Sequence, residues 1–553
     1  MLMNNVDALN IFHPVVKEWF IKNIGIPSLP QVEGWPQIQA GKNVLISAPT
    51  GTGKTLAAFL ESINRLLEMG IRNEMPDGVF ILYVSPLKAL NNDIYKNLEM
   101  PLNGIRQLFE EQGGVFPNIR KAVRTGDTTA YERNQILKKP PHILITTPES
   151  LFLMLTSPKS RDILKNVRYL IVDEIHTMLS TKRGVHLALS IERLEALTEN
   201  SLTRIGLSAT VNPIETAARF LGGLSRADKG YIERPVEMIA PAIERDKDIK
   251  IHAPVYDFRI LEQGSVWPDI YDALVRIIPE HQSTLVFVNN RTTAERVAAN
   301  VNNITGKEIC LPHHGSISKS SRLVVENSFK AGELRCIVAT STLELGIDVG
   351  SVDFIVQISA PPSISSGLQR LGRSGHRLTA TSRGVIIPKS RGDLLKAYYI
   401  ANEMLNGNIE KERIPFNCLD ILSQHIVSMS CNEKWQENDM LELLKQSYSY
   451  KDLKESEFKK VLSMLSGDYE HNEDIPAKPR IVWDRQNKTI EGSSYSRMLA
   501  ISSGGTIPDR GSFGVYLEDY KTRIGELDEE FVFETRIGDR FMLGNSSWRV
   551  TNR

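Results

Sequence analysis

The chain of 553 residues lacks the features that mark several classes of protein. Its four cysteines form no CxxC pair, which argues against zinc ribbons, iron–sulfur clusters and a disulfide-bonded secreted fold. No apolar run reaches the roughly 18 residues needed to cross a bilayer. The N-terminal segment has no basic region followed by an apolar one, so no secretory signal is predicted. We therefore expect a reduced, soluble, cytoplasmic protein.

The chain also lacks an excess of either charge, because 66 Lys and Arg residues balance 66 Asp and Glu residues. Proteins that bind nucleic acid usually carry an excess of basic residues. Any surface that holds phosphate must therefore be local, built from individually placed residues and backbone N–H groups. The length suggests three or four domains, and the hydrophobic (41%) and charged (24%) fractions are those of a globular protein.

Short apolar runs alternate with amphipathic segments from residue 43 to about residue 390. Near-continuous apolar strands separated by helices indicate parallel sheets with helices on both faces. A polar region at 225–282 divides the runs into two series, so we expect two α/β domains in tandem, at 1–225 and 226–410. The predicted strands are 43–48, 80–85, 142–147, 169–174 and 204–209 in the first domain, and 284–289, 335–340, 353–359 and 383–388 in the second; helices are predicted at 55–68 and 291–304.

The pattern changes after about residue 410. Three helical patterns precede a hairpin-like segment at 481–492, which predicts a winged-helix module at 411–493. From residue 494, Gly-punctuated alternation predicts a small β-rich module that extends to residue 553. This module ends on a predicted strand and looks unfinished, so we expect the chain to be part of a longer protein.

The motif APTGTGKT, residues 48–55, follows a predicted strand and opens a predicted helix, as a P-loop does. Its glycines allow successive N–H groups to face phosphate oxygens at a helix N-terminus. Lys54 would reach the β- and γ-phosphates, and the Thr55 hydroxyl would ligate Mg²⁺. The strand–loop–helix context favours a nucleotide site over a coincidental glycine-rich turn. The predicted nucleotide-binding residues of the loop are Thr50, Gly51, Thr52, Gly53, Lys54 and Thr55.

Two acids end the apolar strand at 169–174. Acids at the carboxyl end of a buried strand are costly unless they serve a charged ligand. Asp173 would hold Mg²⁺ through its water shell, and Glu174 would orient or deprotonate the water that attacks the γ-phosphate. An acidic cap between strand and helix is the alternative. Pairing with the P-loop favours hydrolysis of a nucleoside triphosphate.

The second predicted domain has no P-loop but carries QRLGRSGHR at 369–377. Arginine stays charged and presents a fork to phosphate oxygens, so it can stabilise phosphoryl transfer across a domain interface. The segment ATSTLELGID at 339–348 reads as a strand followed by a polar loop. Each segment alone could be a surface loop; their order and position favour a functional role.

These segments occur in the order of the superfamily 2 helicase motifs, together with SPLKAL (85–90), TPES (147–150) and SAT (208–210). The finer likeness is to the large helicase-related (Lhr) family. It includes FHPVVKEWF (12–20), TKRGVHLALSIERL (181–194) and LVFVNNRTTAER (285–296), and it continues past the motor through FNCLDILSQHIVSMS (416–430). The resemblance implies two RecA-like domains, a winged-helix module and a β-rich module, with ATP and Mg²⁺ as cofactors.

The resemblance also implies roles for further residues. Gln31 would read the adenine edge, and Arg373 would be the arginine finger. A histidine stands where the superfamily usually has a second arginine, which leaves that role open between Arg370 and Arg377. Residues implied to line the cleft between the domains are Gly346 and Asp348, and those implied to couple hydrolysis to movement are His176, Ser208, Thr210 and Gln369.

A motor that tracks a strand must hold the phosphates, which every nucleotide shares. Small and hydroxyl residues at strand ends and helix starts expose N–H groups to phosphate oxygens. Asp127 is a poor candidate because its charge repels phosphate, and it could cap a helix instead. The predicted contacts are Ser85, Lys88, Gly126, Thr147 and Ser150 in the first domain, and Arg291, His314, Gly315, Ser316 and Thr342 in the second.

The favoured interpretation is an ATP-dependent translocase and helicase on single-stranded DNA. The resemblance implies 3′-to-5′ movement, unwinding of DNA or RNA:DNA duplexes and a role in DNA repair. One alternative is an RNA helicase or remodeller that opens short duplexes. Another is a scaffold that keeps a nucleotide site for switching, although intact Lys54, Glu174 and Arg373 argue against it.

Overall fold

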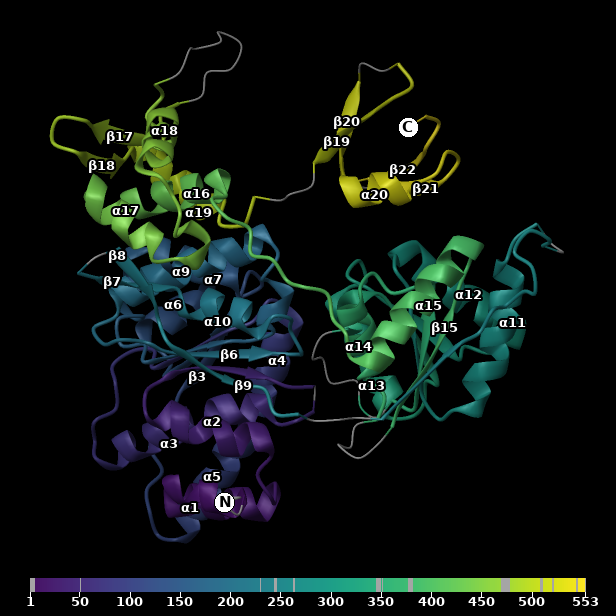
Figure 1. Cartoon of the computed structure of the whole chain (residues 1–553), viewed down its shortest axis with the longest axis horizontal. Helices are drawn as coiled ribbons and strands as arrows, with labels where there is room; N and C mark the ends of the chain where they lie inside the picture. Colours follow the sequence, from purple (N-terminus) through teal and green to yellow (C-terminus); the bar gives the residue numbers. More distant parts are fainter. Residues whose placement is uncertain are drawn as a thin grey trace. The chain divides into compact units, whose positions relative to one another are not determined.

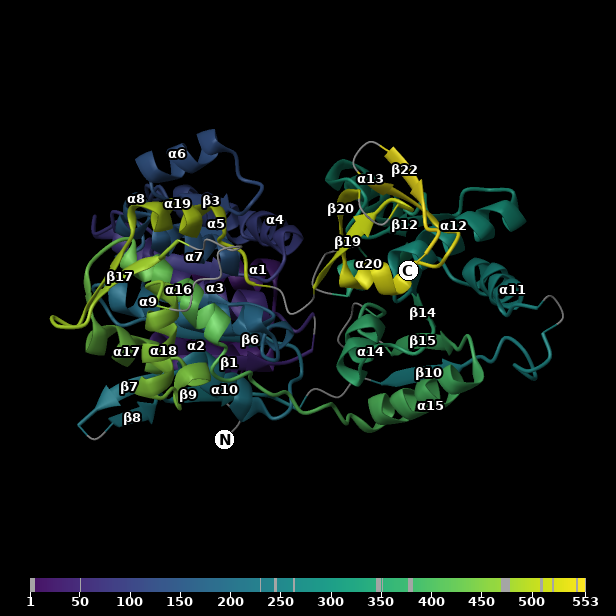
Figure 2. The ribbon, with the colours of Figure 1, turned by 90° about the horizontal axis from the view of Figure 1, so that it is seen from above.

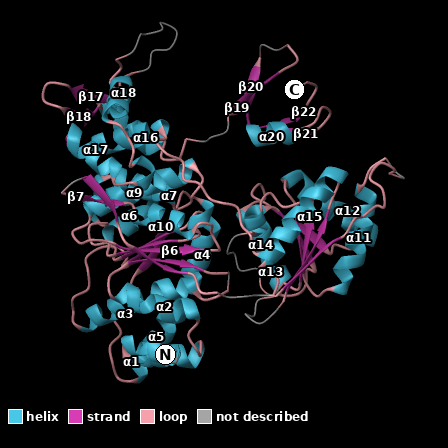
Figure 3. Cartoon of the chain, viewed as in Figure 1, coloured by secondary structure: helices cyan, strands magenta, loops and turns pink. Residues whose placement is uncertain are grey.

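The fold was analysed in a computed structural model, which describes residues 5–49, 51–228, 230–242, 246–261, 264–344, 350, 352–375, 381–468, 478–507, 511–519, 522–543 and 546–552. The chain forms two compact units, Met1–Gly505 and Thr506–Arg553. Figures 1 and 2 show the ribbon in two views, and Figure 3 shows its helices and strands.

The first domain is built on a parallel seven-stranded sheet in the order β3-β4-β2-β5-β6-β1-β9. Alternating side chains point to opposite faces of this sheet. In β1, Val44 and Ile46 therefore join one core, whereas Leu45 joins the other. The strands are β1 (Asn43–Ser47), β2 (Ile81–Val84), β3 (Lys121–Arg124), β4 (Ile143–Thr146), β5 (Tyr169–Val172), β6 (Thr203–Ser208) and β9 (Val236–Ile239). The five predicted strands are confirmed as β1, β2, β4, β5 and β6, whereas β3 and β9 were not predicted.

Helices cover both faces of this sheet (Figure 3). The core on one face includes residues of α1 (Pro14–Asn23), α2 (Leu29–Gln39), α3 (Lys54–Ile71) and α5 (Glu99–Glu111). The core on the other includes residues of α7 (Pro148–Thr156), α9 (Lys182–Leu197) and α10 (Ile214–Gly222). The remaining helices of this domain are α4 (Lys88–Asn97), α6 (Ala130–Lys138) and α8 (Pro158–Asp162).

The first domain extends beyond its expected end at residue 225. A hairpin of β7 (Leu224–Ala227) and β8 (Gly230–Glu233) leads into β9, which pairs with β1. Strand β9 lies at the sheet edge and is mostly accessible to solvent. It therefore carries no continuous apolar run, which is why the sequence pattern resembles a polar connector.

The second domain is a parallel six-stranded sheet in the order β10-β15-β14-β11-β13-β12. Its four predicted strands are confirmed as β11 (Thr284–Phe287), β13 (Cys336–Ala339), β14 (Phe354–Ile358) and β15 (Ser382–Ile387). The two edge strands, β10 (Lys247–Ile251) and β12 (Cys310–His313), are more polar and were not predicted. The helices are α11 (Trp267–Ile277), α12 (Arg291–Thr305), α13 (Lys319–Lys330), α14 (Ile364–Leu371) and α15 (Arg391–Asn406).

The predicted winged-helix module is confirmed. It contains α16 (Leu419–Ser430), α17 (Glu437–Lys445) and α18 (Glu455–Leu465) and an antiparallel sheet of β16 (Trp435–Gln436), β18 (Thr489–Gly492) and β17 (Ile481–Asp484). The expected boundary at residue 494 is wrong, because α19 (Ser494–Ser502) packs on α16 within the first unit. Helix α19 buries Ser496 and Ala500, one turn apart. Such small residues give little hydrophobic signal.

The second unit is β-rich, as predicted, with one short helix. Strands β19 (Ser512–Tyr516) and β20 (Arg523–Asp528) form one antiparallel pair, and β21 (Arg540–Leu543) and β22 (Ser546–Arg549) form another. Helix α20 (Glu529–Glu534) lies between the pairs in the chain. Within the described residues, no helix combines the length and apolarity that a membrane span requires.

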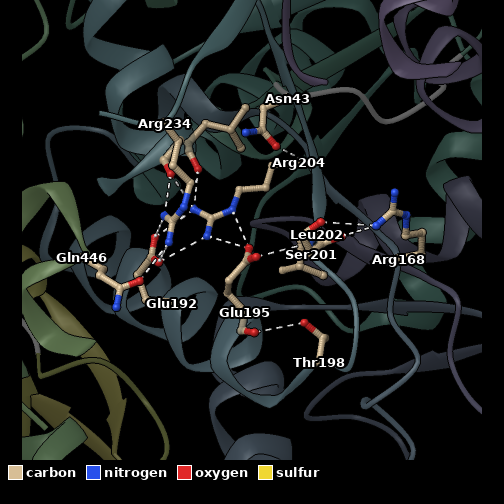
Figure 4. A network of polar contacts seen from close by, with 12 residues as sticks. Asn43, Arg168, Glu192, Glu195, Thr198, Ser201, Leu202, Arg204, Arg234 and Gln446 are labelled. Carbon is tan, nitrogen blue, oxygen red and sulfur yellow. Dashed lines mark hydrogen bonds and ion pairs between the residues drawn. The ribbon is translucent and has the colours of Figure 1, made fainter. Parts of the chain in front are cut away.

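A buried ionic network joins the winged-helix module to the first sheet (Figure 4). Arg204 on β6 pairs with Glu192 at 2.8 Å and with Glu195 at 2.9 Å, both from α9. Arg234 pairs with Glu192 at 2.9 Å and donates to Gln446 Oε1, which follows α17, at 3.0 Å. Breaking such a pair leaves an uncompensated buried charge, at a cost of about 3–5 kcal/mol. The network thus holds the module to one face of the first domain.

Glu61 on α3 is the basis of a stability prediction. Burial, and less so the nearby Glu68, raise its pKa to about 7, against the opposing effect of Arg65. The native state therefore holds a proton that the unfolded state loses near pH 4.5, and stability falls as pH rises from about 4.5 to 7. Relative to the unchanged protein, Glu61→Gln should gain about 2–3 kcal/mol in unfolding free energy between pH 5 and pH 8.

Urea unfolding at the two pH values measures this gain. Glu110→Gln, at an exposed position on α5, is the control. An equal effect of Glu61→Gln at pH 5 and pH 8 would contradict the assignment.

Candidate functional site

The P-loop has the conformation that a phosphate cradle requires. Gly51 and Gly53 have φ angles of +78° and +80°, in a region of the backbone that residues with a Cβ atom rarely adopt. Helix α3 begins at Lys54, so its N-terminal N–H groups face the loop. Lys54 Nζ donates to the carbonyls of Ala48 at 2.6 Å and Pro49 at 2.9 Å, which keeps the ammonium inside the loop.

Gln31 on α2 lies against this loop. Its Nε2 donates to the Gly53 carbonyl at 3.3 Å, and its Oε1 accepts from the Ser28 N–H at 2.9 Å. A Cβ atom on Gly53 would lie 2.6 Å from Gln31 Nε2, so a side chain there would displace Gln31 from the loop. The Ser28 hydroxyl also donates to the Thr52 carbonyl at 2.8 Å. Gln31 therefore lies beside the P-loop, and its role at the adenine edge stays a prediction.

Asp173 and Glu174 follow β5, and both are buried. Burial and the adjacent Glu174 raise the pKa of Asp173 to about 6, against the opposing effects of a hydrogen bond from Tyr83 and of Lys54. The Tyr83 hydroxyl on β2 donates to Asp173 Oδ2, and Phe59 stacks on the Tyr83 ring. Asp173 is thus held from the neighbouring strand, a contact that the sequence did not predict.

Glu174 has a φ angle of +47°, in the left-handed region. Its N–H donates to Asp173 Oδ1 at 2.8 Å, and its carbonyl accepts from the Thr177 N–H at 2.9 Å. A residue with a side chain is strained there, and such strain gathers at functional sites. These bonds hold the Glu174 backbone in the strained conformation.

The residues present fit a magnesium nucleotide. The loop offers a helix N-terminus and an ammonium to phosphate, and the positive φ angles of Gly51 and Gly53 turn the backbone around that position. Thr55 and Asp173 supply a hydroxyl and a carboxylate, the oxygen donors that Mg²⁺ prefers. We therefore regard this site as able to hold ATP with Mg²⁺.

His176 links the two domains. Its Nδ1 accepts from the Ala209 N–H at 3.1 Å and lies 3.3 Å from the Ser208 hydroxyl. Burial and the nearby Lys54 lower the His176 pKa to about 4, so the ring is neutral and Nε2 carries its proton. Gln369 Nε2 of α14 lies 2.7 Å from His176 Nε2. Because Nδ1 already accepts from Ala209, the hydrogen bond forms when the Gln369 amide is turned so that its oxygen accepts the Nε2 proton.

Three of the four predicted coupling residues therefore meet at one point: His176, Ser208 and Gln369. The fourth, Thr210, is exposed. With Pro49 and Gln369 it lines a separate cleft of about 470 Å³ between the two domains. The P-loop and the second domain thus line the same cleft.

Arg370 and Arg373 have different environments. Arg370 donates to Gln357 Oε1 at 2.7 Å and pairs with Glu344 at 2.9 Å, both in the second domain. These contacts place Arg370 in the domain interior and disfavour it as the second catalytic arginine. Arg373 donates to the Glu344 carbonyl at 2.9 Å. The other candidate, Arg377, and the predicted residues Thr50, Gly346 and Asp348 lie outside the described residues.

A groove of about 1300 Å³ runs between the two domains. Residues of the first domain that line it include Gly126, Thr147 and Ser150, and Thr342 lines it from the second. The Thr147 hydroxyl caps α7 by accepting from the Ser150 N–H at 3.4 Å. Most of the predicted first-domain contacts therefore share one surface with Thr342.

Other predicted contacts lie elsewhere. Ser85 is fully buried, and the residues after it, Pro86 and Leu87, line the groove in its place. The side chain of Lys88 lies outside the described residues. Arg291, His314, Gly315 and Ser316 do not line the groove; they form a separate cluster in which Arg291 donates to the Ser316 hydroxyl at 3.1 Å.

Sequence reasoning missed several groove residues. Arg183, which precedes a buried turn of α9, forms a two-bond ion pair with Glu149 (2.5 Å and 3.0 Å). Arg322 enters from α13, and Ile501 enters from the end of α19. Arg183 stands within the TKRGVHL segment that carries the family likeness, which was the available signal.

Comparison with known proteins gives consistent matches. Family models match residues 402–552 (large helicase-related protein, winged helix domain), 28–218 (DEAD/DEAH box helicase) and 269–377 (helicase conserved C-terminal domain). The Lhr helicase/probable uracil glycosylase of Mycolicibacterium smegmatis is 42% identical across the whole of this chain. An ATP-dependent helicase Lhr-Core of Methanocaldococcus jannaschii is 42% identical over 98% of it. The chain belongs to the Lhr family of superfamily 2 helicases.

A solved Lhr structure also matches. Mycobacterium smegmatis helicase Lhr, bound to ssDNA and AMP-PNP, is 43% identical with a TM-score of 0.84, and the match covers 96% of this chain and 66% of that one. The chain spans 38% of the M. smegmatis relative and 62% of the M. jannaschii Lhr-Core protein. The likeness to Lhr therefore includes the motor and the winged-helix module of this chain.

The contact between His176 and Gln369 generates a prediction for this Lhr chain. Removing either side chain leaves a buried polar partner unpaired. His176→Ala and Gln369→Ala should each lower ATPase turnover on single-stranded nucleic acid, with little change in nucleotide affinity. The double variant should be no slower than the slower single variant, because the two side chains act as one unit.

Steady-state ATPase assays and titration with a fluorescent ATP analogue measure the two effects. Losses that add in the double variant would contradict a direct coupling contact.

Proposed function

We propose that this chain hydrolyses ATP to move 3′-to-5′ along single-stranded DNA and to unwind DNA or RNA:DNA duplexes. We further propose a role in DNA repair, which rests on the family resemblance alone. The observation that supports the motor function is that the groove and the nucleotide site have residues in common. His176 and Gln369 contact each other and line the groove. Both also lie close to the nucleotide site, because His176 Nε2 is 3.5 Å from Glu174 Oε2 and Gln369 lines a cleft with Pro49 of the P-loop.

The residues of the nucleotide site divide the chemistry among themselves. Lys54 and the start of α3 would hold the phosphates, and Thr55 and Asp173 would hold Mg²⁺, which neutralises charge on the phosphate oxygens when bound. Glu174 lies beside the neutral His176, with Oε2 3.5 Å from Nε2, and would orient the attacking water. Arg373 would supply its charge from the second domain.

The charge of the groove supports a grip through backbone and hydroxyl groups. Among the described residues that line it, six are acidic and three are cationic. The acids are Asp93, Asp127, Glu149, Glu326, Glu344 and Glu412, and the cations are Lys96, Arg183 and Arg322. A wall of this composition does not attract a polyanion by net charge. N–H groups and hydroxyls, among them those of the predicted contacts Gly126, Thr147, Ser150 and Thr342, are donors that carry no charge.

The tracked strand is proposed to be DNA, by analogy with the ssDNA-bound M. smegmatis helicase Lhr. Activity on RNA duplexes is the alternative. Tailed duplexes separate the possibilities: 3′- and 5′-tailed substrates test polarity, and DNA or RNA displaced strands test substrate class. ATPase that is unaffected by any single strand would contradict the motor function itself.

Substitution of the phosphoryl-transfer residues should abolish strand displacement. Lys54→Ala and Glu174→Ala are each expected to lower it at least 100-fold, because these groups act as a unit. Arg373→Ala should lower turnover more than ATP binding, which a titration with a fluorescent ATP analogue measures. Full hydrolysis by Glu174→Ala would show that another group orients the water.

The salt dependence of single-strand binding should be shallow. About three cationic contacts predict a slope near −2 for the logarithm of the binding constant against the logarithm of salt concentration, or about a 20-fold loss between 50 and 200 mM. Fluorescence anisotropy of a labelled oligonucleotide measures it. A slope of −5 or steeper would contradict a grip dominated by backbone and hydroxyl groups.

A further inference from the structure

A short segment after α15 contacts both motor domains. It comprises residues 409–412, which we name the strap, and it precedes α16 (Figure 1). Asn212 of the first domain donates from Nδ2 to the Ile409 carbonyl at 2.9 Å. The Glu412 N–H donates to the Asn212 carbonyl at 2.7 Å. Asn212 lies two residues after Thr210, so the strap is attached to the loop that follows β6.

The strap is anchored further at its C-terminal end. The Ser180 hydroxyl of the first domain donates to Glu412, and the Arg413 N–H donates to Ser180 at 3.4 Å. Ile414 is buried in the core of the first domain. Hydrogen bonds and apolar packing thus fix this part of the chain to the first domain before it continues to the winged-helix module.

Glu410, between these anchors, contacts the second domain instead. Its carboxylate accepts from the Ile364 N–H at 2.5 Å and from the Ser365 N–H at 3.2 Å, the first two residues of α14. A carboxylate at a helix N-terminus satisfies unpaired donors and complements the helix dipole. The same helix carries Gln369, and Arg373 follows its end.

We propose that Glu410 is a positioning residue for the motor reaction. One carboxylate holds the start of α14, while its neighbours hold the loop beyond Thr210. The strap therefore fixes α14 in register with the first domain, so that Gln369 meets His176 and Arg373 is presented to the nucleotide. This inference rests on the proposed ATP-driven function.

An ordinary helix cap is the competing explanation for Glu410. Loss of a cap lowers helix stability and would change the melting temperature without a specific effect on turnover. Loss of a positioning contact lowers kcat and leaves the KM for ATP unchanged, because the phosphate site lies in the other domain. The two explanations therefore differ in a measurable way.

The test compares Glu410→Ala with Lys411→Ala, which changes an exposed neighbour in the same strap. We expect Glu410→Ala to lower the kcat of DNA-stimulated ATPase about tenfold, with the KM for ATP within twofold of the unchanged protein. Lys411→Ala should retain full turnover. Glu410→Gln keeps an acceptor oxygen and should recover part of the loss.

Each outcome is decisive. Equal turnover of Glu410→Ala, Lys411→Ala and the unchanged protein would overturn the proposal. A loss of turnover in Glu410→Ala that vanishes after correction for the folded fraction would also overturn it. A Glu410→Gln variant whose only defect is a lower melting temperature would likewise indicate an ordinary helix cap. If the unchanged protein shows no DNA-stimulated ATPase, the proposed function fails first, and this result is distinguishable from failure of the strap.

Discussion

The contact between His176 and Gln369 is the constraint on which the organisation of the motor depends. It is polar, short and largely removed from solvent, and it joins the strand that carries the acids to the helix that leads to Arg373. A neutral imidazole suits this position because it donates through one nitrogen while the other accepts from Ala209. We therefore expect a rearrangement at the nucleotide to reach the groove, because the groove wall includes the same two side chains.

The rest of the first unit supports this contact. Arg234, which pairs with the buried Glu192 and donates to Gln446, holds the winged-helix module to the first domain. The strap attaches α14 to the loop after β6. Such attachments leave few independent ways for the parts to move. A two-domain motor needs such restricted motion, because closure of the two domains must move a strand and not merely shift other parts of the chain.

The sequence predicted what depends on local pattern. Buried central strands such as β1 and β5 are continuous apolar runs, and the P-loop and the Asp173–Glu174 pair follow them directly. It did not predict β9, β10 or α19, because edge strands are half exposed and α19 packs through small residues. Nor did it predict Tyr83 beside Asp173, or the strap, because contacts between distant segments leave no periodic signal.

The left-handed backbone at Glu174 has a consequence for how such a site persists. Glycine would adopt a φ angle of +47° without penalty, whereas a residue with a Cβ incurs about 1–2 kcal/mol. The fold itself would thus tolerate, or even favour, glycine at this position, although glycine has no carboxylate to orient water. Folding alone therefore gives no reason for a carboxylate at this position, whereas the proposed role of Glu174 in turnover does.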